Sequence, residues 1–465
     1  MTTSPAHDNT KLDPEVCRRA RLSRDRRFDG EFFLAVRTTG IYCRPICPAR
    51  APVEKNVIYY KSSSQAAQAG YRPCLRCRPE SAPDSPAWKG TSATVQRALQ
   101  LMRQGALNDG SLAKLAERLG VGERYLRKLF QRELGVSPQA VALNQRLLFA
   151  KKLLAETSLP ITEVAFAAGF GSVRRFNSAV RTHFKLTPGQ LRGRRGAGSP
   201  QRGISLQLHY RPPYDWQAIS NFFRRHAIAG VETMTAEYYQ RNLLLPGGPA
   251  TFQVRPKPGA HALQLDLQLP DHSLLMPVVA RIRRMFDLDA NPAAIAATLG
   301  QDPLLAPLLQ ACPGIRAPGH WSLHESSIRA IVGQQVSTAA ARSIIARLAV
   351  ATSADPEHPT FPEAADMAAL DDSHFPMPGR RRETLRSLCR TLIEREDELD
   401  LDTLAALKGV GPWTVAMVSM RGAGDPDTFP NKDLGLEQAW LQLDGENTPL
   451  QHHSAGWRPW RSYAA

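Results

Sequence analysis

Four of the seven cysteines stand in two close pairs, Cys43-x3-Cys47 and Cys74-x2-Cys77. A short pair places two sulfur atoms on one side of a metal ion, and two pairs complete a tetrahedral site. The spacing therefore predicts one Zn²⁺ held by four cysteines. A purely structural zinc site is the usual meaning of such spacing. Disulfides of a secreted framework fit the two close pairs less well.

A second group of residues that could do chemistry lies at 404–416, in the string Leu-Ala-Ala-Leu-Lys-Gly-Val-Gly-Pro-Trp-Thr-Val-Ala. Apolar residues end a helix there, Gly409 and Gly411 form a tight hairpin, and Pro412 starts the next helix. The glycines let the backbone approach a phosphate, and the following helix offers free N–H groups. This pattern predicts a helix-hairpin-helix that binds DNA without reading its sequence. A plain turn between two helices is the alternative.

Two similar units in residues 95–192 would position a third group of polar side chains. Residues 112–130 and 161–176 each contain a short apolar helix, a glycine turn and a second helix that mixes aromatic and basic residues. This layout is typical of a helix-turn-helix, whose second helix enters the major groove. A small helical bundle can mimic one unit, but two in tandem favour DNA binding. The candidates for base contact are Glu123, Arg124, Arg127, Ser172, Arg174 and Arg175.

The charge distribution supports a polyanionic partner for the front of the chain. The 465 residues carry a net charge of +16. Residues 1–200 hold 34 Lys and Arg against 15 Asp and Glu, whereas residues 201–465 hold 25 against 28. A strongly basic half next to a nearly neutral half indicates nucleic-acid binding in the first half. A soluble basic surface without such a partner is the alternative.

The length predicts about three domains at roughly 150 residues each. Stretches rich in Pro, Gly and Ser at 79–90 and 193–203 read as linkers, and a softer boundary falls at 313–319. Alternating apolar residues within 204–311 predict strands, with helical patterns between them. We expect a multidomain α+β chain with four parts: a small zinc-thiolate domain (10–80), an all-α double helix-turn-helix domain (91–192), a mixed α/β domain (204–316) and an all-α helix-hairpin-helix domain (317–465).

Membrane and secreted proteins are disfavoured. The sequence contains no apolar stretch near the ~20 residues of a membrane span, and its first residues lack the apolar core of a signal peptide. We therefore expect a cytoplasmic protein.

The first cysteine pair lies in residues 37–45, Arg-Thr-Thr-Gly-Ile-Tyr-Cys-Arg-Pro, and the second in residues 71–77, Tyr-Arg-Pro-Cys-Leu-Arg-Cys. Over about residues 10–80 this sequence closely resembles the N-terminal zinc domain of the Ada family of adaptive-response regulators. The resemblance implies that Cys43 is both zinc ligand and nucleophile, and that it accepts a methyl group irreversibly from a DNA methyl phosphotriester. Zinc keeps sulfur as the nucleophilic thiolate. Thr39, Arg50 and Arg72 are implied as backbone contacts, with solvated surface residues as the alternative.

The tandem helical units resemble the AraC family of activators, and the C-terminal half resembles the helix-hairpin-helix glycosylases of the AlkA type. The second resemblance rests on residues 332–337, 404–416 and 429–436, and it extends to 204–311, which is similar to the N-terminal mixed α/β domain of those enzymes. It implies hydrolysis of the bond between sugar and alkylated base, such as 3-methyladenine. A carboxylate suits that reaction because positive charge develops on the sugar.

The glycosylase resemblance assigns roles residue by residue. Asp433 is the catalytic carboxylate, Trp413 forms a wall of the base pocket, and Gln335 fills the gap left by the flipped base. Trp413 stands where relatives that also cut the backbone carry a lysine, so the enzyme is expected to be monofunctional. Met417 replaces a pocket tyrosine. The carbonyls of Ala405, Leu407 and Gly409 are implied as ligands of a monovalent cation.

The chain departs from the family pattern at its C-terminus, where residues 457–464 match a family motif and the sequence stops at Ala465. In the family a further helix follows, so base binding here is expected to be weaker or altered. The leading interpretation is a monomeric repair enzyme and transcription activator that binds double-stranded DNA and RNA polymerase. One alternative is a regulator whose glycosylase-like module is catalytically impaired. Another is a zinc-ribbon DNA-binding protein without methyl transfer.

Overall fold

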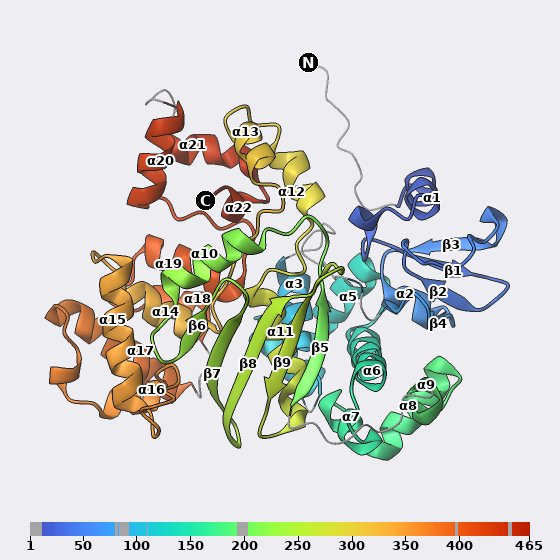
Figure 1. The fold of residues 1–465 in the computed structure, drawn as a ribbon, viewed down its shortest axis with the longest axis horizontal. Helices are drawn as coiled ribbons and strands as arrows, with labels where there is room; N and C mark the ends of the chain where they lie inside the picture. The colour runs from blue at the N-terminus through green and yellow to red at the C-terminus, as the bar shows by residue number, and fades with distance from the viewer. Residues whose placement is uncertain are drawn as a thin grey trace. The chain divides into compact units, whose positions relative to one another are not determined.

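The computed structural model describes residues 12–79, 82, 93–108, 110–192, 203–395, 399–444 and 449–465. Most of the two predicted linkers, 79–90 and 193–203, lies outside the described residues. The chain divides into two compact units. Unit 1 comprises residues 1–212, 271–280 and 289–291, and unit 2 comprises 213–270, 281–288 and 292–465. Each unit is described by itself (Figure 1).

Unit 1 begins with a small sheet in the strand order β3-β1-β2-β4. Strands β1 and β2 form an antiparallel hairpin in which Leu34 pairs with Cys43, and β4 runs parallel to β2. This pairing brings the turn after β4 next to the end of β2, so the two cysteine pairs meet. The elements are α1 (Pro14–Leu22), η1 (Arg26–Phe28), β1 (Phe33–Val36), β2 (Ile41–Cys43), η2 (Glu54–Asn56), β3 (Val57–Tyr60), α2 (Ser63–Gln68) and β4 (Arg72–Pro73).

Helices follow, and both predicted helix-turn-helix units are confirmed as helix pairs, α4–α5 and α7–α8. Ser111, Ser137 and Ser172 cap the starts of α4, α6 and α8 by accepting a backbone N–H. The elements are α3 (Ala93–Arg103), α4 (Leu112–Arg118), α5 (Glu123–Leu134), α6 (Pro138–Glu156), α7 (Ile161–Ala167), α8 (Val173–Phe184), α9 (Pro188–Arg192), then β5 (Ile204–His209) and η5 (His272–Leu274). The long helix α6 joins the pair α4–α5 to the pair α7–α8 (Figure 1).

Unit 2 contains strands that lie side by side in the order β9-β8-β7-β6, all antiparallel. Leu263, Leu265 and Leu267 on β9 are buried and alternate with less buried polar residues, as strand period requires. The elements are α10 (Trp216–His226), β6 (Glu232–Met234), β7 (Tyr239–Leu245), β8 (Gly248–Pro256) and β9 (Ala262–Gln268). The expectation of a mixed α/β region is confirmed.

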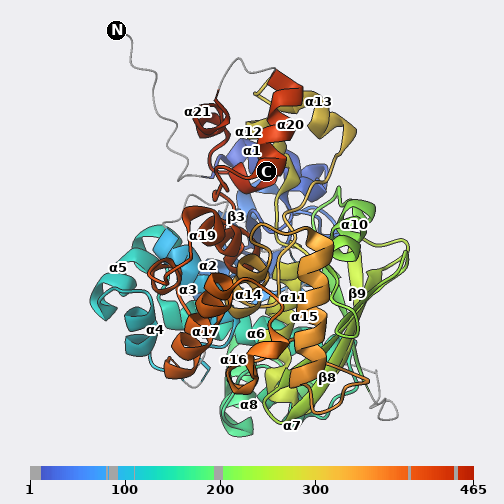
Figure 2. The same ribbon diagram turned by 90° about the vertical axis from the view of Figure 1, so that its left-hand side faces the viewer.

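The remainder of unit 2 is helical. Figures 1 and 2 show α14, α15, α17 and α19 packed side by side, around a core that includes Ile331, Leu385 and Val418. The elements are α12 (Pro292–Leu299), α13 (Leu305–Ala311), α14 (Leu323–Val332), α15 (Thr338–Thr352), α16 (Ala364–Ala369), η6 (Asp372–His374), α17 (Gly379–Glu394), α18 (Leu401–Ala405), α19 (Pro412–Val418), the π-helical turn η7 (Ser419–Ala423), α20 (Leu434–Asp444), α21 (Leu450–His453), η8 (Ser454–Trp457) and α22 (Arg461–Ala464). Helix α11 (Leu275–Met285) is shared between the units.

A ring of four buried charges links the sheet of unit 2 to helix α14. Arg241 on β7 contacts Glu232 at 2.9 Å and Glu325 at 2.5 Å. Arg329, one turn along α14 from Glu325, contacts the same two carboxylates at 2.7 Å each. Each charge therefore has two partners of opposite sign, as buried charges require.

Candidate functional sites

The four predicted zinc ligands come together. The sulfur atoms of Cys43, Cys47, Cys74 and Cys77 all lie within 4.8 Å of one another. Zinc–sulfur bonds of about 2.3 Å in a tetrahedron place the sulfurs about 3.8 Å apart, so the spacing fits one zinc ion. Four thiol donors are also the set that Zn²⁺ favours over hard cations such as Mg²⁺.

Two cationic side chains bind backbone carbonyl oxygens of the cysteine ligands. Arg44 follows Cys43 and is buried, and its guanidinium pairs with Asp29 and donates to the carbonyl oxygen of Cys77 at 3.0 Å. Lys151, on α6 and 4% exposed, donates to the carbonyl oxygen of Cys74 at 2.9 Å. Neither contact was predicted, because the carbonyl that each side chain binds lies 33 or 77 positions away in the sequence.

Hydrogen bonds to the four sulfurs are unequal. The Arg44 N–H donates to Cys77 Sγ at 3.3 Å, and the Arg76 N–H donates to Cys74 Sγ at 3.4 Å. Among the described residues no backbone N–H donates to Cys43 Sγ. Without a metal, a hydrogen bond from Cys43 lowers the pKa of Cys47 to about 7 and also lowers the pKa of Cys74. Hydrogen bonds with Cys47, Cys74 and Cys77 raise the pKa of Cys43. A zinc ion, when bound, would hold this sulfur as a thiolate.

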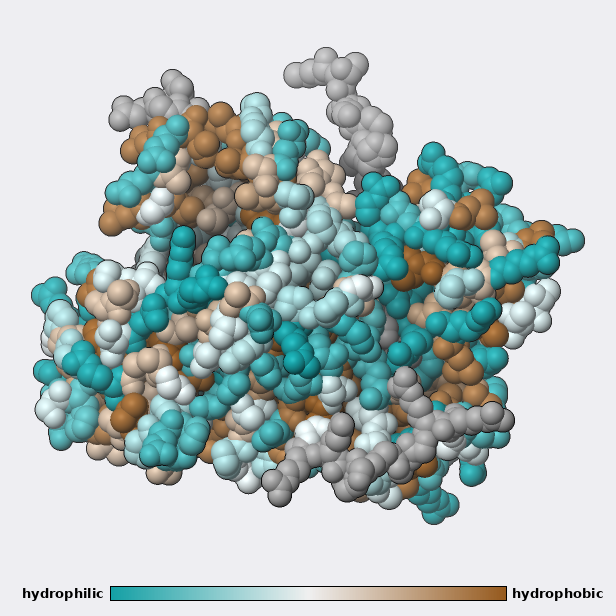
Figure 3. Space-filling model, viewed as in Figure 1, coloured by the Kyte–Doolittle hydropathy of each residue, from teal (hydrophilic) through white to brown (hydrophobic). Residues whose placement is uncertain are grey.

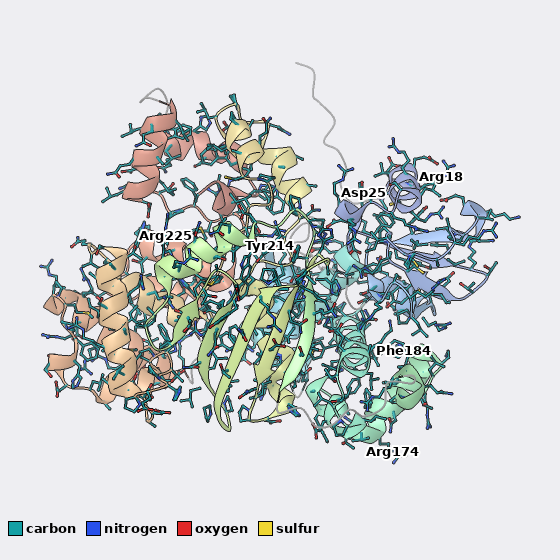
Figure 4. All side chains as sticks on the ribbon, in the orientation of Figure 1. Arg18, Asp25, Arg174, Phe184, Tyr214 and Arg225 are labelled. Carbon is teal, nitrogen blue, oxygen red and sulfur yellow. The ribbon has the colours of Figure 1, made fainter. Side chains whose placement is uncertain are left out.

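The predicted DNA contacts are mostly at the surface of unit 1. Thr39 in the β1–β2 turn and Arg50 are exposed, whereas Arg72 on β4 is half-buried. The four arginines predicted to contact DNA from the second helices are all exposed: Arg124 and Arg127 on α5, and Arg174 and Arg175 on α8. Arg127 pairs with Glu123 one turn earlier. Figure 4 shows Arg174 at the surface of α8, where solvent and a ligand can reach it.

The predicted hairpin joins α18 to α19. Gly409 adopts a φ of +90°, which side chains rarely tolerate, and an added Cβ would lie 2.1 Å from Thr384 Oγ1. Thr384 on α17 donates to the carbonyl oxygen of Lys408 at 3.0 Å and so supports the hairpin from behind. Gly411 precedes α19, and Pro412 occupies its first turn, as expected.

The hairpin carbonyls are already hydrogen-bonded in part. The carbonyl oxygen of Leu407 accepts from the Val410 N–H at 3.1 Å, and that of Gly409 accepts from Gln334 Nε2 at 3.1 Å. Gln334 also donates to Thr414 Oγ1 at 3.1 Å. The sequence analysis did not single out Gln334.

Trp413 and Asp433 come together although 20 positions separate them. Trp413 Nε1 donates to Asp433 Oδ2 at 2.9 Å. The other oxygen of this carboxylate accepts the N–H groups of Gly435 and Leu436 at 3.0 and 3.1 Å, so Asp433 also caps helix α20. Met417 is half-buried and lies one turn after Trp413 on α19, so it shares a face with it.

The surroundings of Asp433 are partly apolar. Leu434, the first residue of α20, is 75% exposed, and Leu441 and Leu443 are also exposed. Figure 3 shows apolar residues gathered over α20. Gln335 is exposed in the loop between α14 and α15 and has a left-handed backbone with φ of +56°.

Together the fold and these sites describe a multidomain protein with a four-cysteine metal module, two helix-turn-helix units and a helix-hairpin-helix beside a Trp–Asp pair. Three known families match: the metal-binding domain of Ada over residues 16–80, a helix-turn-helix domain over residues 115–194 and the AlkA N-terminal domain over residues 205–322.

The chain is 41% identical over 97% of its length, and over 95% of the relative, to the probable bifunctional transcriptional activator/DNA repair enzyme AlkA of Mycobacterium tuberculosis. It is 31% identical to DNA-3-methyladenine glycosylase 2 of Escherichia coli, over 55% of this chain and 94% of the relative. It is 37% identical to the bifunctional transcriptional activator/DNA repair enzyme Ada of Escherichia coli, over 37% of this chain and 47% of that protein. The chain therefore belongs to the family of AlkA-type bifunctional transcriptional activators and DNA repair enzymes.

Among the described residues, no helix has the length and apolarity that crossing a membrane requires.

Proposed function

We propose that the chain repairs alkylated DNA and regulates transcription in response to the damage. The observation that carries this proposal is the presence, in one chain, of a four-thiol cluster, two helix-turn-helix units and a Trp413–Asp433 pair beside a glycine hairpin. Full-length similarity to a named bifunctional activator and repair enzyme supports it. Double-stranded DNA, both damaged and at promoters, is the ligand.

In the proposed sensor reaction, Cys43 accepts a methyl group from a methyl phosphotriester of the DNA backbone. Its sulfur forms a bond to the methyl carbon as the carbon–oxygen bond breaks, and the electron pair stays on the restored phosphodiester. Zinc, when bound, keeps the sulfur as thiolate. Cys74 and Cys77 each receive a backbone N–H hydrogen bond, which withdraws electron density, whereas Cys43 receives none among the described residues. This difference favours Cys43 over Cys74 and Cys77 as the nucleophile.

Methyl transfer also supplies the proposed switch. Four thiolates on Zn²⁺ carry a net charge of about −2, and methylating one leaves about −1. A surface that loses negative charge repels DNA phosphates less, so affinity for DNA rises. Arg124, Arg127, Arg174 and Arg175 are the proposed base-reading or phosphate-binding groups, and Thr39, Arg50 and Arg72 are proposed contacts of the zinc module with the backbone.

In the proposed excision reaction, Asp433 stabilises the positive charge that develops on the deoxyribose as the alkylated base leaves, and helps a water molecule to attack. The bond between sugar and base breaks, the water oxygen bonds to the sugar carbon, and an abasic site remains. Trp413 and Met417 line the pocket for the flipped base, and an electron-rich aromatic ring suits a cationic base. We propose monofunctional chemistry because Trp413 occupies the place where a Schiff-base lysine would stand.

The proposal includes four further points. Its functional domains are 10–80, 91–192, 204–316 and 317–465. Gln335 fills the gap left by the flipped base. A monovalent cation binds the carbonyls of Ala405, Leu407 and Gly409, the last two of which also accept hydrogen bonds within the protein. The protein acts as a monomer and engages RNA polymerase at promoters.

Two assays test the proposed function. Purified protein is incubated with duplex DNA that contains 3-methyladenine, and the free base is measured; its release supports the glycosylase. Intact protein is also exposed to methyl-phosphotriester DNA, and mass spectrometry is expected to find one added methyl group on Cys43. Cys47 is half-buried whereas Cys43 is only 8% exposed, so a methyl group on Cys47 is the outcome that would reject our choice of acceptor. Methyl transfer without base release would favour a regulator with an impaired glycosylase module.

A further inference from the structure

The loop between α14 and α15, residues 333–337, holds an unusual backbone at its tip. Gln335 has a φ of +56°, a left-handed conformation that residues other than glycine rarely adopt, and its side chain is exposed. Such a conformation persists where neighbouring contacts hold it. The loop is closed at its C-terminal side by Ser337, which caps α15 by accepting the Ala340 N–H at 3.2 Å.

The residue before the tip ties this loop to the hairpin. Gln334 donates two hydrogen bonds from its side-chain amide nitrogen: Nε2 lies 3.1 Å from the Gly409 carbonyl oxygen and 3.1 Å from Thr414 Oγ1. An amide NH₂ group has two hydrogens, so both are used. One acceptor lies in the hairpin and the other, which is 2% exposed, lies in the first turn of α19.

These bonds continue to the candidate carboxylate. Thr414 is the neighbour of Trp413 on α19, and Trp413 Nε1 is 2.9 Å from Asp433 Oδ2. A continuous series of covalent and hydrogen bonds therefore runs from the exposed tip at Gln335, through Gln334, the hairpin and Trp413, to Asp433. Packing of α14 against α19 would hold the two helices together without Gln334. It would not fix the position of the Gln335 tip relative to the hairpin.

We propose that Gln334 is a positioning residue that fixes the Gln335 tip relative to the phosphate-binding hairpin. When the hairpin binds the DNA backbone, the tip then lies at the base step where the flipped base leaves a gap. Binding of the strand and filling of the gap therefore occur together. The inference rests on the proposed glycosylase function. Gln334 touches neither the base nor the reacting atoms, and it acts through Gln335 and the hairpin.

The test uses the full chain and a Gln334→Glu variant, which keeps the shape but cannot donate to the Gly409 carbonyl, together with Gln334→Ala. A duplex with a tetrahydrofuran abasic-site analogue and a neighbouring 2-aminopurine reports local unstacking as a rise in fluorescence. We expect both variants to lose most of this rise and to lower single-turnover release of 3-methyladenine about 100-fold, because a displacement of about 1 Å costs that much. Binding to undamaged duplex is expected to stay within about threefold, since the hairpin glycines remain.

Variants of the partner separate positioning from simple loss of packing. Thr414→Val removes one acceptor of Gln334 and Thr414→Ser keeps it, so we expect only the valine variant to lower the fluorescence rise. The double variant Gln334→Ala/Thr414→Val should be no worse than Gln334→Ala, because both changes break the same hydrogen bond. A fluorescence rise that survives in both Gln334 variants would overturn the inference, as would equal losses in the serine and valine variants.

The fluorescence assay also separates this inference from the proposed function. If wild-type protein releases no base but gives the fluorescence rise, and the Gln334 variants lose it, the glycosylase proposal fails and the positioning role stands. If wild-type protein gives no fluorescence rise on the abasic analogue, the positioning role is rejected whatever the excision rate.

Discussion

Replacing Asp433 with Asn should lower the rate of base excision strongly while lowering the stability of the fold only slightly. The carboxylate accepts Trp413 Nε1 on one oxygen and the N–H groups of Gly435 and Leu436 on the other. In Asp433→Asn the remaining oxygen can keep the two backbone bonds, but the amide nitrogen then faces another donor at Trp413. Losing this one bond and the charge near the start of α20 should lower the free energy of unfolding by about 1–2 kcal/mol.

The catalytic cost should be larger. Removing a group that stabilises charge in the transition state typically lowers the rate by about 10²–10³, or about 2.7–4 kcal/mol. Single-turnover release of 3-methyladenine measures this loss, and fluorescence anisotropy on an abasic-site duplex should show binding within a few-fold of wild type. Asp433→Ser is the matched control, because serine also caps helices but carries no charge. If Asp433→Asn excises within about threefold of wild type, Asp433 is a helix cap only and our reasoning is wrong.

Three further perturbations follow from the structure. Cys47→Ala should release zinc and abolish amide-exchange protection over 12–79, since this small domain has little core of its own; retained protection would contradict a folding role for the metal. Gly409→Ala, whose Cβ would lie 2.1 Å from Thr384 Oγ1, should weaken duplex binding about tenfold irrespective of sequence, and unchanged affinity would argue against the hairpin as the grip. Burial alone would raise the pKa of Glu325, but attraction by Arg241 and Arg329 lowers it from 4.5 to about 2. Unit 2 should therefore keep this stabilisation above about pH 4.5 and lose it as the pH falls towards 2. Denaturant unfolding followed by circular dichroism measures this change, and a free energy of unfolding that stays constant across that range would contradict a stabilising role for the charge ring.

The sequence predicted those features that local patterns encode. The spacing of the two cysteine pairs was enough to predict a metal cluster. The helix pairs and the hairpin were predicted from the helical period of the apolar residues and from the positions of glycine and proline. The strands of residues 204–311 were likewise predicted from alternation.

Features that depend on distant pairing were not predicted from the residues themselves. Lys151 lies 77 positions from the carbonyl it binds, and Gln334 lies 75 from the Gly409 carbonyl. Both are ordinary surface residue types, so nothing nearby marks them. Asp433 became a candidate through the family resemblance, because its spacing from Trp413 carries no periodic signal. The left-handed backbone of Gln335 was also missed, since sequence signals such a conformation mainly through glycine.

The buried charge ring constrains how this chain can be divided and recombined. Glu232 and Arg241 come from the sheet, and Glu325 and Arg329 come from the first helix of the bundle, so the ring bridges the boundary that we propose after residue 316. A fragment that begins at 317 would keep the pair between Glu325 and Arg329 but would remove the other partner of each. Breaking a buried pair costs about 3–5 kcal/mol. The sheet and the helices that follow it are therefore expected to fold as one unit, and a recombinant chain that keeps one of them should keep the other.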